Sequence, residues 1–409
     1  MKVLIVNSHF FPCGGDTTYM FNLIRLLKEQ GHEPIPFAMN HPKNVKNPYS
    51  KYFVSEVHIG DLLEKKTPAR ILKAMRRFIY SLEARFRLRE LIQAEKPDVA
   101  HLQCIHGYIT PSIVSELKSH GIPIVWTLHD YKTICPNSLL LSHGNICEDC
   151  RGQKFFWATI KKCKRGSLAA SLLISIEAYV HHGMNLYAGV DQFIGPSCFL
   201  CKKIGEFDFG RYRLSYIPHF IFSDCYEPSY EAGSYALFFG RLDAHKGILT
   251  LLKAAAINRN IPIKIAGDGA LLNKLAEEIR RQGLHHVSLM GFLTGDPLSA
   301  LIRNAAFIVF PSIWYENAPF SILESYAFGK PVIASNLGGI TEHIKDGETG
   351  FLCEPGNDEE LARKMAYLYE RPEFCEEMGR NARALIDAEY SPPKHYANLM
   401  RVYESVIGV

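Results

Sequence analysis

Short apolar runs of strand length alternate with amphipathic stretches of helix length throughout the first half of the chain. The runs are continuous and rich in β-branched residues, as strands buried on both faces of a sheet should be. They read VLIVN (3–7), VAHL (99–102), IVWTLH (124–129) and QFIGPS (192–197). Between them lie stretches such as YMFNLIRLLKEQG, which closes on Gly31, a residue common at helix ends. The alternation predicts a parallel sheet built from βαβ units.

The same pattern restarts after a Pro-, Ser- and Gly-containing break at residues 223–234. The later runs read YALFFG, IPIKIAG, HVSLMGF, AAFIVFPS and KPVIAS, each followed by a helix or turn. A chain of 409 residues is also too long for one ordinary core and suits two domains of roughly 200 residues. The sequence therefore predicts an α/β protein with two doubly wound parallel sheets. A ligand is expected at the carboxyl ends of the strands, between the domains.

Charge and hydropathy bear on location and partners. No apolar run approaches the roughly 18 residues that a membrane span needs, and MKVLIVNSHF turns polar too early for a signal peptide, so we expect a cytoplasmic protein.

The part through Phe222 holds 28 Lys and Arg against 18 Asp and Glu. Much of this excess lies in residues 65–89, a basic and partly amphipathic stretch. It suits peripheral contact with an anionic membrane, or is simply a solvated helix face. Nucleic acid is not expected as a partner, because no recognised binding module accompanies the charge.

The second half carries the features expected of a phosphate site. YALFFG leads into a loop with Arg241 and Lys246 and then into a helix. Two cations beside a helix N-terminus can neutralise a diphosphate, although surface cations on a βα loop are the structural alternative. In IPIKIAGDGALL, Gly267 and Gly269 permit a tight turn near a ligand. The third glycine of a dinucleotide fingerprint is missing, and no acidic residue ends the next strand, which disfavours an NAD enzyme.

Two glutamates, Glu316 and Glu324, flank an almost wholly apolar segment between a strand and a helix. We expect Glu324 in the first helical turn and Glu316 in the preceding loop. A carboxylate in that turn can accept the hydroxyls of a ribose, and a loop carboxylate can reach those of a second sugar. The structural alternative is a capping box, because Ser321 and Glu324 have its spacing.

These motifs together resemble the retaining glycosyltransferases of the GT-B fold, and specifically glycosyltransferase family 4. The resemblance rests on GRLDAHKG, GDG, FPSIWYENAPFSILE, GKPVIASNLGGITEHIKDGETGFL and the closing Tyr390-Ser391-Pro392, with FPCGG and TLHD in the first half. It implies two Rossmann-like domains facing across a cleft. Residues 1–222 plus 391–409 would bind the acceptor, because the last helix crosses back in this family, and residues 232–390 would bind a nucleotide-sugar donor.

The resemblance also implies roles for individual residues. Arg241 and Lys246 would grip the donor diphosphate, Glu324 the ribose and Glu316 the transferred sugar, while His129 would sit beside the reacting carbon. The remaining residues expected at the donor or along the cleft are Gly14, Gly15, Gly267, Asp268, Gly269, Ser321, Ile322, Leu323 and Asn336, with Asp130 also in the cleft. One departure concerns the loop after Glu316, which reads Asn-Ala-Pro-Phe-Ser where a glycine-containing segment is frequent.

The expected reaction moves a sugar from a nucleotide-diphosphate sugar to a lipid-linked or polysaccharide-precursor acceptor. Metal-dependent transferases commonly hold their cation with a D-x-D motif, and this chain has no two Asp residues two positions apart. Arg241 and Lys246 would then stabilise the leaving diphosphate, with no cofactor required for catalysis. Retention of configuration follows from the resemblance alone. A GT-B epimerase or phosphorylase, or a non-catalytic partner subunit, are the alternatives.

A separate motif lies in residues 133–165, which we treat as a Cys-rich insertion. Its four thiols are Cys135, Cys147, Cys150 and Cys163, with one tight C-x2-C pair. Four thiols at such spacings can close a tetrahedral site, so a structural zinc is one interpretation. An iron–sulfur cluster or reduced thiols are the others, because a cytosolic setting argues against disulfides. Cys198-x2-Cys201 has no second pair nearby in the sequence.

Overall fold

The computed structural model describes residues 1–56 and 77–408. The chain divides into two compact units, which are described separately. The first unit comprises Met1–His143, Cys147–Pro218 and His395–Val409, and the second comprises Gly144–Ile146 and His219–Lys394. The main divisions fall at 218/219 and 394/395, beside the boundaries at 222 and 391 that the sequence suggested.

The first unit contains a six-stranded sheet in the order β2-β1-β3-β4-β7-β8, and every neighbouring pair is parallel. Its strands are β1 (Lys2–Val6), β2 (Glu33–Phe37), β3 (Val99–Leu102), β4 (Ile124–Thr127), β7 (Gln192–Gly195) and β8 (Leu214–Tyr216). The runs that predicted β1, β3 and β4 are almost wholly buried, because helices cover both faces of the sheet.

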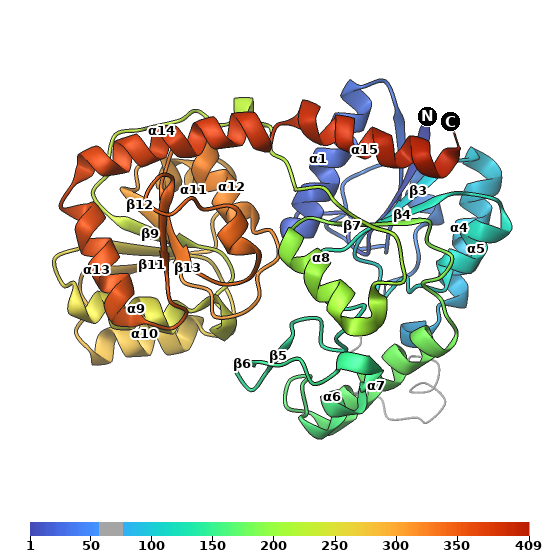
Figure 1. Cartoon of the computed structure of the whole chain (residues 1–409), viewed down its shortest axis with the longest axis horizontal. Coiled ribbons are helices and arrows are strands. Elements are labelled where there is room, and N and C mark those ends of the chain that lie inside the picture. Colours follow the sequence, from blue (N-terminus) through green and yellow to red (C-terminus); the bar gives the residue numbers. More distant parts are fainter. Residues whose placement is uncertain (57–76, 409) are drawn as a thin grey trace. The chain divides into compact units, whose positions relative to one another are not determined.

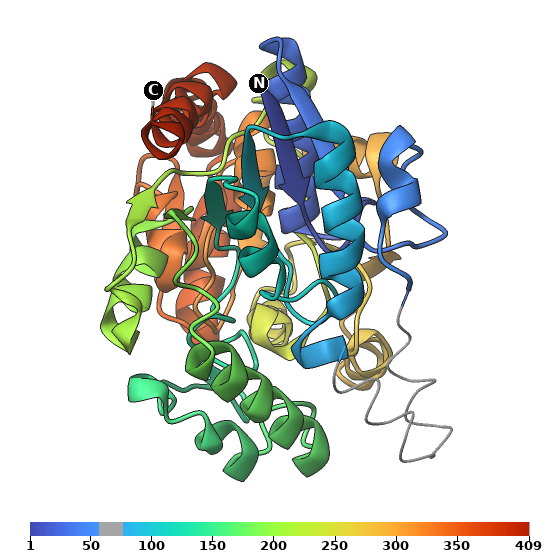
Figure 2. The ribbon, with the colours of Figure 1, turned by 90° about the vertical axis from the view of Figure 1, so that its right-hand side faces the viewer.

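The helices of this unit are α1 (Gly15–Glu29), α4 (Leu82–Glu95), α5 (Ile113–Ser119), α6 (Phe156–Ile160), α7 (Leu168–Gly183), α8 (Cys198–Ile204) and, from His395 onward, α15 (Pro392–Ile407). Helices α4 and α5 pack side by side (Figure 2). A small hairpin, β5 (Leu141–Ser142) and β6 (Asn145–Ile146), precedes α6. Helix α15 is tied to the unit by buried hydrogen bonds: Tyr403 Oη lies 2.6 Å from His101 Nδ1, and Tyr19 Oη lies 3.2 Å from His395 Nε2.

The second unit contains another six-stranded parallel sheet, in the order β11-β10-β9-β12-β13-β14 (Figure 1). Its strands are β9 (Ala236–Phe239), β10 (Ile263–Ala266), β11 (Val287–Gly291), β12 (Phe307–Phe310), β13 (Val332–Ser335) and β14 (Gly350–Cys353). Its helices are α9 (Ile248–Ile257), α10 (Leu272–Arg281), α11 (Gly295–Arg303), α12 (Phe320–Ala327), α13 (Asp358–Tyr369) and α14 (Pro372–Glu389). Relative to its own first strand this is the 3-2-1-4-5-6 order of Rossmann sheets.

Both predicted doubly wound sheets are therefore confirmed. In each, the strand order reverses direction once, between β1 and β3 in the first unit and between β9 and β12 in the second. At such a switch point the following loops run to opposite faces of the sheet and leave a crevice at the carboxyl edge. Functional groups are therefore expected at these two places.

The basic stretch 65–89 is only partly described, since residues 65–76 lie outside the described residues. Its described cations are engaged by carboxylates. Arg85 and Arg89 both reach the fully buried Glu116, at 3.1 and 2.7 Å. Arg77 pairs with Glu83 and Arg87 with Glu90. The four described cations of this stretch are therefore paired within the first unit.

Within residues 1–56 and 77–408, no helix combines the length and the apolar content that crossing a bilayer would take.

Candidate functional site

Most of the predicted donor residues lie at the carboxyl edge of the second sheet. Arg241 and Lys246 follow β9 and Glu316 follows β12, so these three flank the switch point. The other residues at this edge are Gly267, Asp268 and Gly269 after β10 and Asn336 after β13. Four adjacent strands thus bring together residues that are up to 95 positions apart in the sequence.

The central contact at this edge is a buried ion pair between Lys246 and Glu316. Lys246 Nζ lies 2.7 Å from Glu316 Oε1, and the Ser312 hydroxyl donates to the same oxygen at 2.6 Å. Only 5% of Glu316 is exposed. Burial alone would raise the pKa of Glu316, but the Lys246 ammonium and the Ser312 hydroxyl outweigh it and hold that pKa below its ordinary value. Glu316 is therefore a carboxylate at neutral pH, and its charge is matched by Lys246.

Backbone contacts fix the two loops that carry this pair. Gly247 adopts φ +70°, and a Cβ built there would lie 1.7 Å from the carbonyl oxygen of Pro311. No other residue type fits that position without moving the backbone. Next to it, Ile313 N donates to His245 O at 2.9 Å. Because Gly247 adjoins Lys246, this close approach sets the ammonium against Glu316.

Arg241 and Asp268 are held more loosely. The Arg241 side chain is 73% exposed and pairs with Asp243. Asp268 is exposed; its Oδ1 accepts from Gly269 N at 2.8 Å, and its carbonyl accepts from Leu242 N at 2.9 Å. Lys246 is thus fixed in place, whereas the Arg241 guanidinium has room to swing toward a ligand.

Glu324 lies in the second turn of α12, two residues further from the helix start than the spacing of Ser321 and Glu324 suggested. The helix begins at Phe320 with Pro319 as its N-cap, so the expectation of a first-turn glutamate is wrong and so is the capping-box alternative. Among the described residues the Glu324 carboxyl has no hydrogen-bond partner. Burial raises its pKa to about 7. Ile322 and Leu323 are buried and Ser321 is half-buried, so a ligand would reach the two apolar residues only through their backbone.

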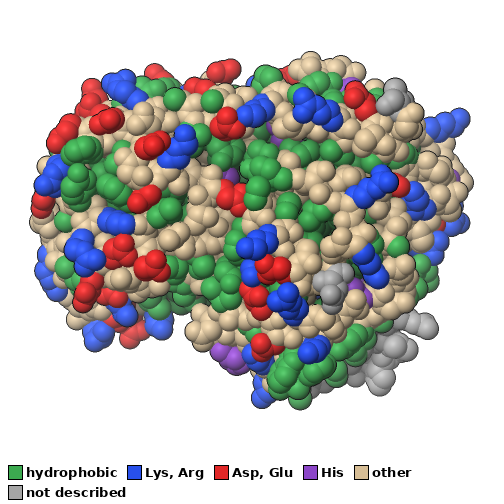
Figure 3. Space-filling view, in the orientation of Figure 1, with side chains coloured by type: hydrophobic (Ala, Val, Ile, Leu, Met, Phe, Trp, Pro, Cys, Tyr) green, Lys and Arg blue, Asp and Glu red, His purple; other side chains and the backbone are tan. Residues whose placement is uncertain are grey.

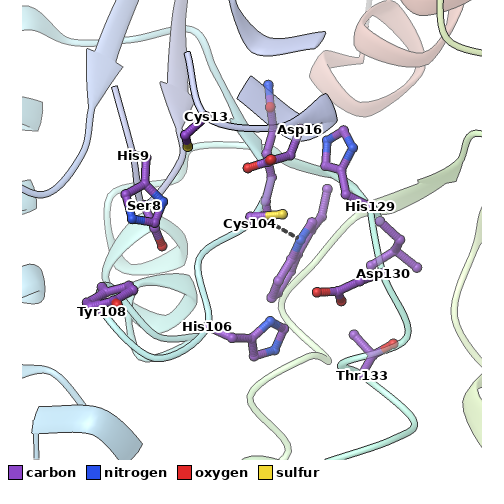
Figure 4. A pocket seen from close by; sticks show the side chains of 13 residues that line it. Ser8, His9, Cys13, Asp16, Cys104, His106, Tyr108, His129, Asp130 and Thr133 are labelled. Atoms are coloured by element: carbon purple, nitrogen blue, oxygen red, sulfur yellow. Dashed lines mark hydrogen bonds between the residues drawn. The ribbon is translucent and has the colours of Figure 1, made fainter. Parts of the chain in front are cut away.

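The first unit has a cavity of about 280 Å³ at its own switch point (Figure 4). Its lining comes from the residues that follow β1, β3 and β4, together with Trp126 of β4 itself. These are Ser8, His9, Cys13, Asp16, Gln103, Cys104, His106, Tyr108, Trp126, Leu128, His129, Asp130 and Thr133. The lining contains two carboxylates and no Lys or Arg.

Several polar groups of this lining are buried without an internal partner. Both amide atoms of Gln103 and the hydroxyls of Ser8 and Thr133 make no hydrogen bond in the described part of the chain. Gln103 is only 1% exposed, and its backbone is fixed because Trp126 Nε1 donates to its carbonyl at 2.8 Å. An unpaired buried polar group costs roughly 1–3 kcal/mol, which a ligand hydroxyl would recover.

His129 and Asp130 both line this cavity. Burial lowers the pKa of His129 to about 4, against the opposing effect of Asp16, so the imidazole is neutral near pH 7. Burial raises the pKa of Asp130 to about 6, although Lys132 N donates to its Oδ1 at 2.8 Å. At neutral pH the cavity therefore offers a neutral imidazole beside a largely ionised carboxylate.

Gly14 and Gly15 are exposed at the start of α1, between the lining residues Cys13 and Asp16. Gly14 is extended, with φ 179°, a conformation open to any residue. A small residue at this helix N-terminus leaves the backbone accessible, which is what close approach of a phosphate needs.

The sequence analysis missed Ser8, Asp16, Gln103 and Trp126. The available signal was positional: Ser8 and Gln103 follow the ends of β1 and β3 directly. The rule that ligands bind beyond the carboxyl ends of parallel strands points to these residues once the strands are located. Nothing in their residue types marks them.

The four cysteines of the insertion line one small cavity of about 10 Å³, together with Asn137, Trp157 and Lys161. The thiols are engaged locally: Cys135 Sγ donates to Asn137 Oδ1 at 2.9 Å, and Lys161 Nζ donates to Cys147 Sγ at 3.5 Å. Burial raises the pKa of Cys135 to about 11 and also raises that of Cys150. As the side chains stand, no three His, Cys, Asp or Glu residues in the described ranges are arranged to hold a metal ion.

Comparisons with known proteins identify the family and support the fold. Residues 13–221 match the family model described as Glycosyltransferase Family 4, and residues 227–385 match Glycosyl transferases group 1. The chain is 24% identical to the "Uncharacterized glycosyltransferase MJ1178" of Methanocaldococcus jannaschii over 99% of both chains. Sucrose-phosphate synthase from Thermosynechococcus elongatus has a TM-score of 0.72 at 16% identity, covering 100% of this chain and 99% of that one. Anabaena Alr3699/HepE in complex with UDP-glucose has a TM-score of 0.65 at 17% identity, covering 99% and 100%.

The matched models define an enzyme, a glycosyltransferase, and its fold is that of the GT-B class. The chain belongs to the group 1/family 4-like glycosyltransferases.

The raised pKa of Glu324 predicts a pH-dependent stability. The folded chain holds this proton up to about pH 7, whereas an unfolded glutamate releases it near its ordinary 4.5, so stability falls as pH rises between these values. Glu324→Gln removes this component. The free energy of unfolding of the variant should equal that of the parent near pH 4.5. At pH 8 it should exceed that of the parent by up to about 3 kcal/mol.

The measurement is thermal unfolding at pH 5, 6.5 and 8. Glu377→Gln, at an exposed position of α14, is the matched control. Its melting temperature should differ from that of the parent by the same amount at all three pH values. If the difference in melting temperature between Glu324→Gln and the parent is also the same at all three pH values, the raised pKa of Glu324 is contradicted.

Proposed function

We propose that the protein is a retaining, metal-independent transferase of glycosyltransferase family 4. It moves a sugar from a nucleotide-diphosphate sugar to a saccharide acceptor that is lipid-linked or a polysaccharide precursor. The observation that supports this best is the Lys246–Glu316 pair at the switch point of the second sheet. It offers a fixed ammonium for a diphosphate and a carboxylate for sugar hydroxyls, with the exposed Arg241 nearby in sequence.

In the proposed reaction the bond from the anomeric carbon to the diphosphate breaks as the acceptor oxygen forms the new glycosidic bond. The acceptor proton passes to an oxygen of the leaving diphosphate, on the same face. Negative charge grows on the diphosphate, and Lys246 and Arg241 stabilise it in place of a metal ion. Glu316 holds the transferred sugar and Glu324 the ribose, the latter as a carboxylate once bound hydroxyls lower its pKa.

The lining of the first-unit cavity suits an uncharged sugar as the acceptor group. Its unpaired amide and hydroxyls suit sugar hydroxyls, and Trp126 and Tyr108 add aromatic surface. With Asp16 and Asp130 present and no Lys or Arg in the lining, a phosphate or carboxylate entering this cavity would meet like charge. We therefore expect the sugar end of the acceptor to enter here. His129 contacts donor and acceptor near the reacting carbon.

Lys246→Ala and Arg241→Ala should each lower kcat/KM by about a hundredfold, on the order of 3 kcal/mol of transition-state stabilisation. Arg241 is exposed, so its variant should melt like the parent and report on charge alone. Lys253→Ala, an exposed lysine on α9, is the control. Release of nucleoside diphosphate measures the rate. Parent-like turnover in both variants, or strong stimulation of the parent by Mg²⁺ or Mn²⁺, would refute the proposed charge stabilisation.

Gln103→Met tests the acceptor cavity. The change removes an unpaired buried amide at similar volume, so stability should hold or rise. The acceptor KM should rise about tenfold or more while the donor KM stays the same, and neutral acceptors should outperform their phosphorylated counterparts in the parent. Gln93→Met, at an exposed position of α4, is the control. An unchanged acceptor KM would place the acceptor elsewhere.

We also propose that the four cysteines of the insertion bind a structural zinc. The segment around them has little regular structure and a small core of its own, Cys150, Phe155, Ala158 and Ala178. Its backbone holds non-glycine residues at positive φ, among them Ser138, Leu140, His143 and Lys162. A cross-link through a metal ion would stabilise the folded form of such a segment. The cavity between the thiols suits one atom-sized occupant, and metal binding would require the thiols to turn inward and lose their protons.

Protein purified without chelator should contain about one zinc per chain. Cys150→Ser should lose it and lower the melting temperature, whereas Cys198→Ser, in the other C-x2-C of the chain, should retain it. Elemental analysis decides the question, and a parent with negligible metal after growth in zinc-supplemented medium rules the site out.

A further inference from the structure

Helices α6 and α7 carry an exposed apolar surface on the first unit. Its members are Phe156 (43% exposed), Ile160 (61%), Leu168 (56%), Leu172 (48%) and Tyr179 (43%). We call these five residues the α6–α7 patch. Figure 3 shows an area of hydrophobic side chains at its lower edge, where Figure 1 places the two helices.

The patch is continuous across both helices because they pack on each other. Thr159 Oγ1 lies 2.8 Å from Ser175 Oγ, and Phe156 N donates to Tyr179 Oη at 3.2 Å. Leu168, Leu172 and Tyr179 share one face of α7 by helical spacing, as Phe156 and Ile160 do on α6. The only acidic residue on α7 is Glu177, which is buried against Lys132 at 2.6 Å. The solvent-facing side of α7 therefore carries no acidic charge.

The surroundings of the patch are basic. The cations of residues 148–183 are Arg151, Lys154, Lys161, Lys162, Lys164 and Arg165, against the acids Glu148, Asp149 and Glu177. All three acids are already paired, with Lys203, Lys161 and Lys132. Lys154, Lys162 and Arg165 are exposed and form no ion pair within the described ranges. Positive charge thus remains uncompensated beside exposed apolar side chains.

We propose that the α6–α7 patch docks on an anionic lipid surface. Apolar and aromatic side chains enter the interface of a bilayer while neighbouring lysines and arginines contact the anionic headgroups. A second copy of the chain is a poorer occupant, because a symmetric pairing would bring the two basic rims together. The site differs from the basic stretch 65–89, whose described cations are engaged by glutamates. It also goes beyond the proposed function, since docking requires no donor or acceptor.

Co-sedimentation with vesicles tests the proposal. The full chain should bind vesicles of phosphatidylcholine with 30% phosphatidylglycerol at least tenfold more strongly than pure phosphatidylcholine, and salt should weaken the binding. Ile160→Ser/Leu172→Ser should reduce it at least fivefold, and so should Lys162→Glu/Arg165→Glu. Phe292→Ser, which changes a side chain 73% exposed in the second unit, is the matched control and should bind like the parent.

Two further readouts separate docking from catalysis and from folding. All the substituted side chains are exposed, so melting temperatures should stay within about a degree. Transfer to a soluble saccharide acceptor should be unchanged in the patch variants. Parent chains that stay in the supernatant with anionic vesicles overturn the proposal. So do patch variants that sediment like the parent, or a parent that dimerises through the patch and loses dimerisation in Ile160→Ser/Leu172→Ser.

Discussion

The carboxyl ends of all strands in a parallel sheet lie on the same side of the sheet. This constraint determines where polar residues gather in both units. The inner strands are buried on both faces, so polar side chains within them are few and are hydrogen-bonded, as His101 of β3 is to Tyr403. Polar and charged residues therefore collect in the loops at the strand ends. In the first unit those loops enclose a cavity with carboxylates and unpaired amide and hydroxyl groups. In the second they carry a matched pair of opposite charges. One architecture thus supplies two chemically different sites.

The difference between the two sites is electrostatic. In the second unit, burial of Glu316 is offset by Lys246 only 2.7 Å away, so the carboxylate stays ionised despite its low exposure. In the first unit burial meets weaker opposition, and the pKa of Asp130 rises to about 6 while that of His129 falls to about 4. Removing charge from water is costly, so a buried group either pairs with an opposite charge or has its pKa shifted toward the neutral form.

Sequence reasoning recovered both parallel sheets, because burial on both faces leaves a direct trace in composition, but it did not predict β2, β8 and β14. The runs at residues 3–7 and 99–102 are strands that pair with each other. It also located Lys246 and Glu316, whose residue types carry the signal. It misplaced Glu324 within its helix by two residues, because Pro319 rather than Ser321 is the N-cap of α12.

Other features left no trace that a linear reading could use. Gln103 matters because its amide is buried without a partner, and burial of a loop residue depends on neighbours distant in sequence. The α6–α7 patch escaped notice for a related reason. An apolar helix face predicts a core contact, and only the three-dimensional arrangement reveals that nothing in the described residues covers it.

The position of α15 has a consequence for biosynthesis. Tyr403 and His395 complete the interior of the first unit through His101 and Tyr19, although some 175 residues of the second unit separate them from the rest of that unit. A ribosome releases the second unit before it releases this helix. The unit whose strands are translated first is therefore the one whose last interior side chains are translated last.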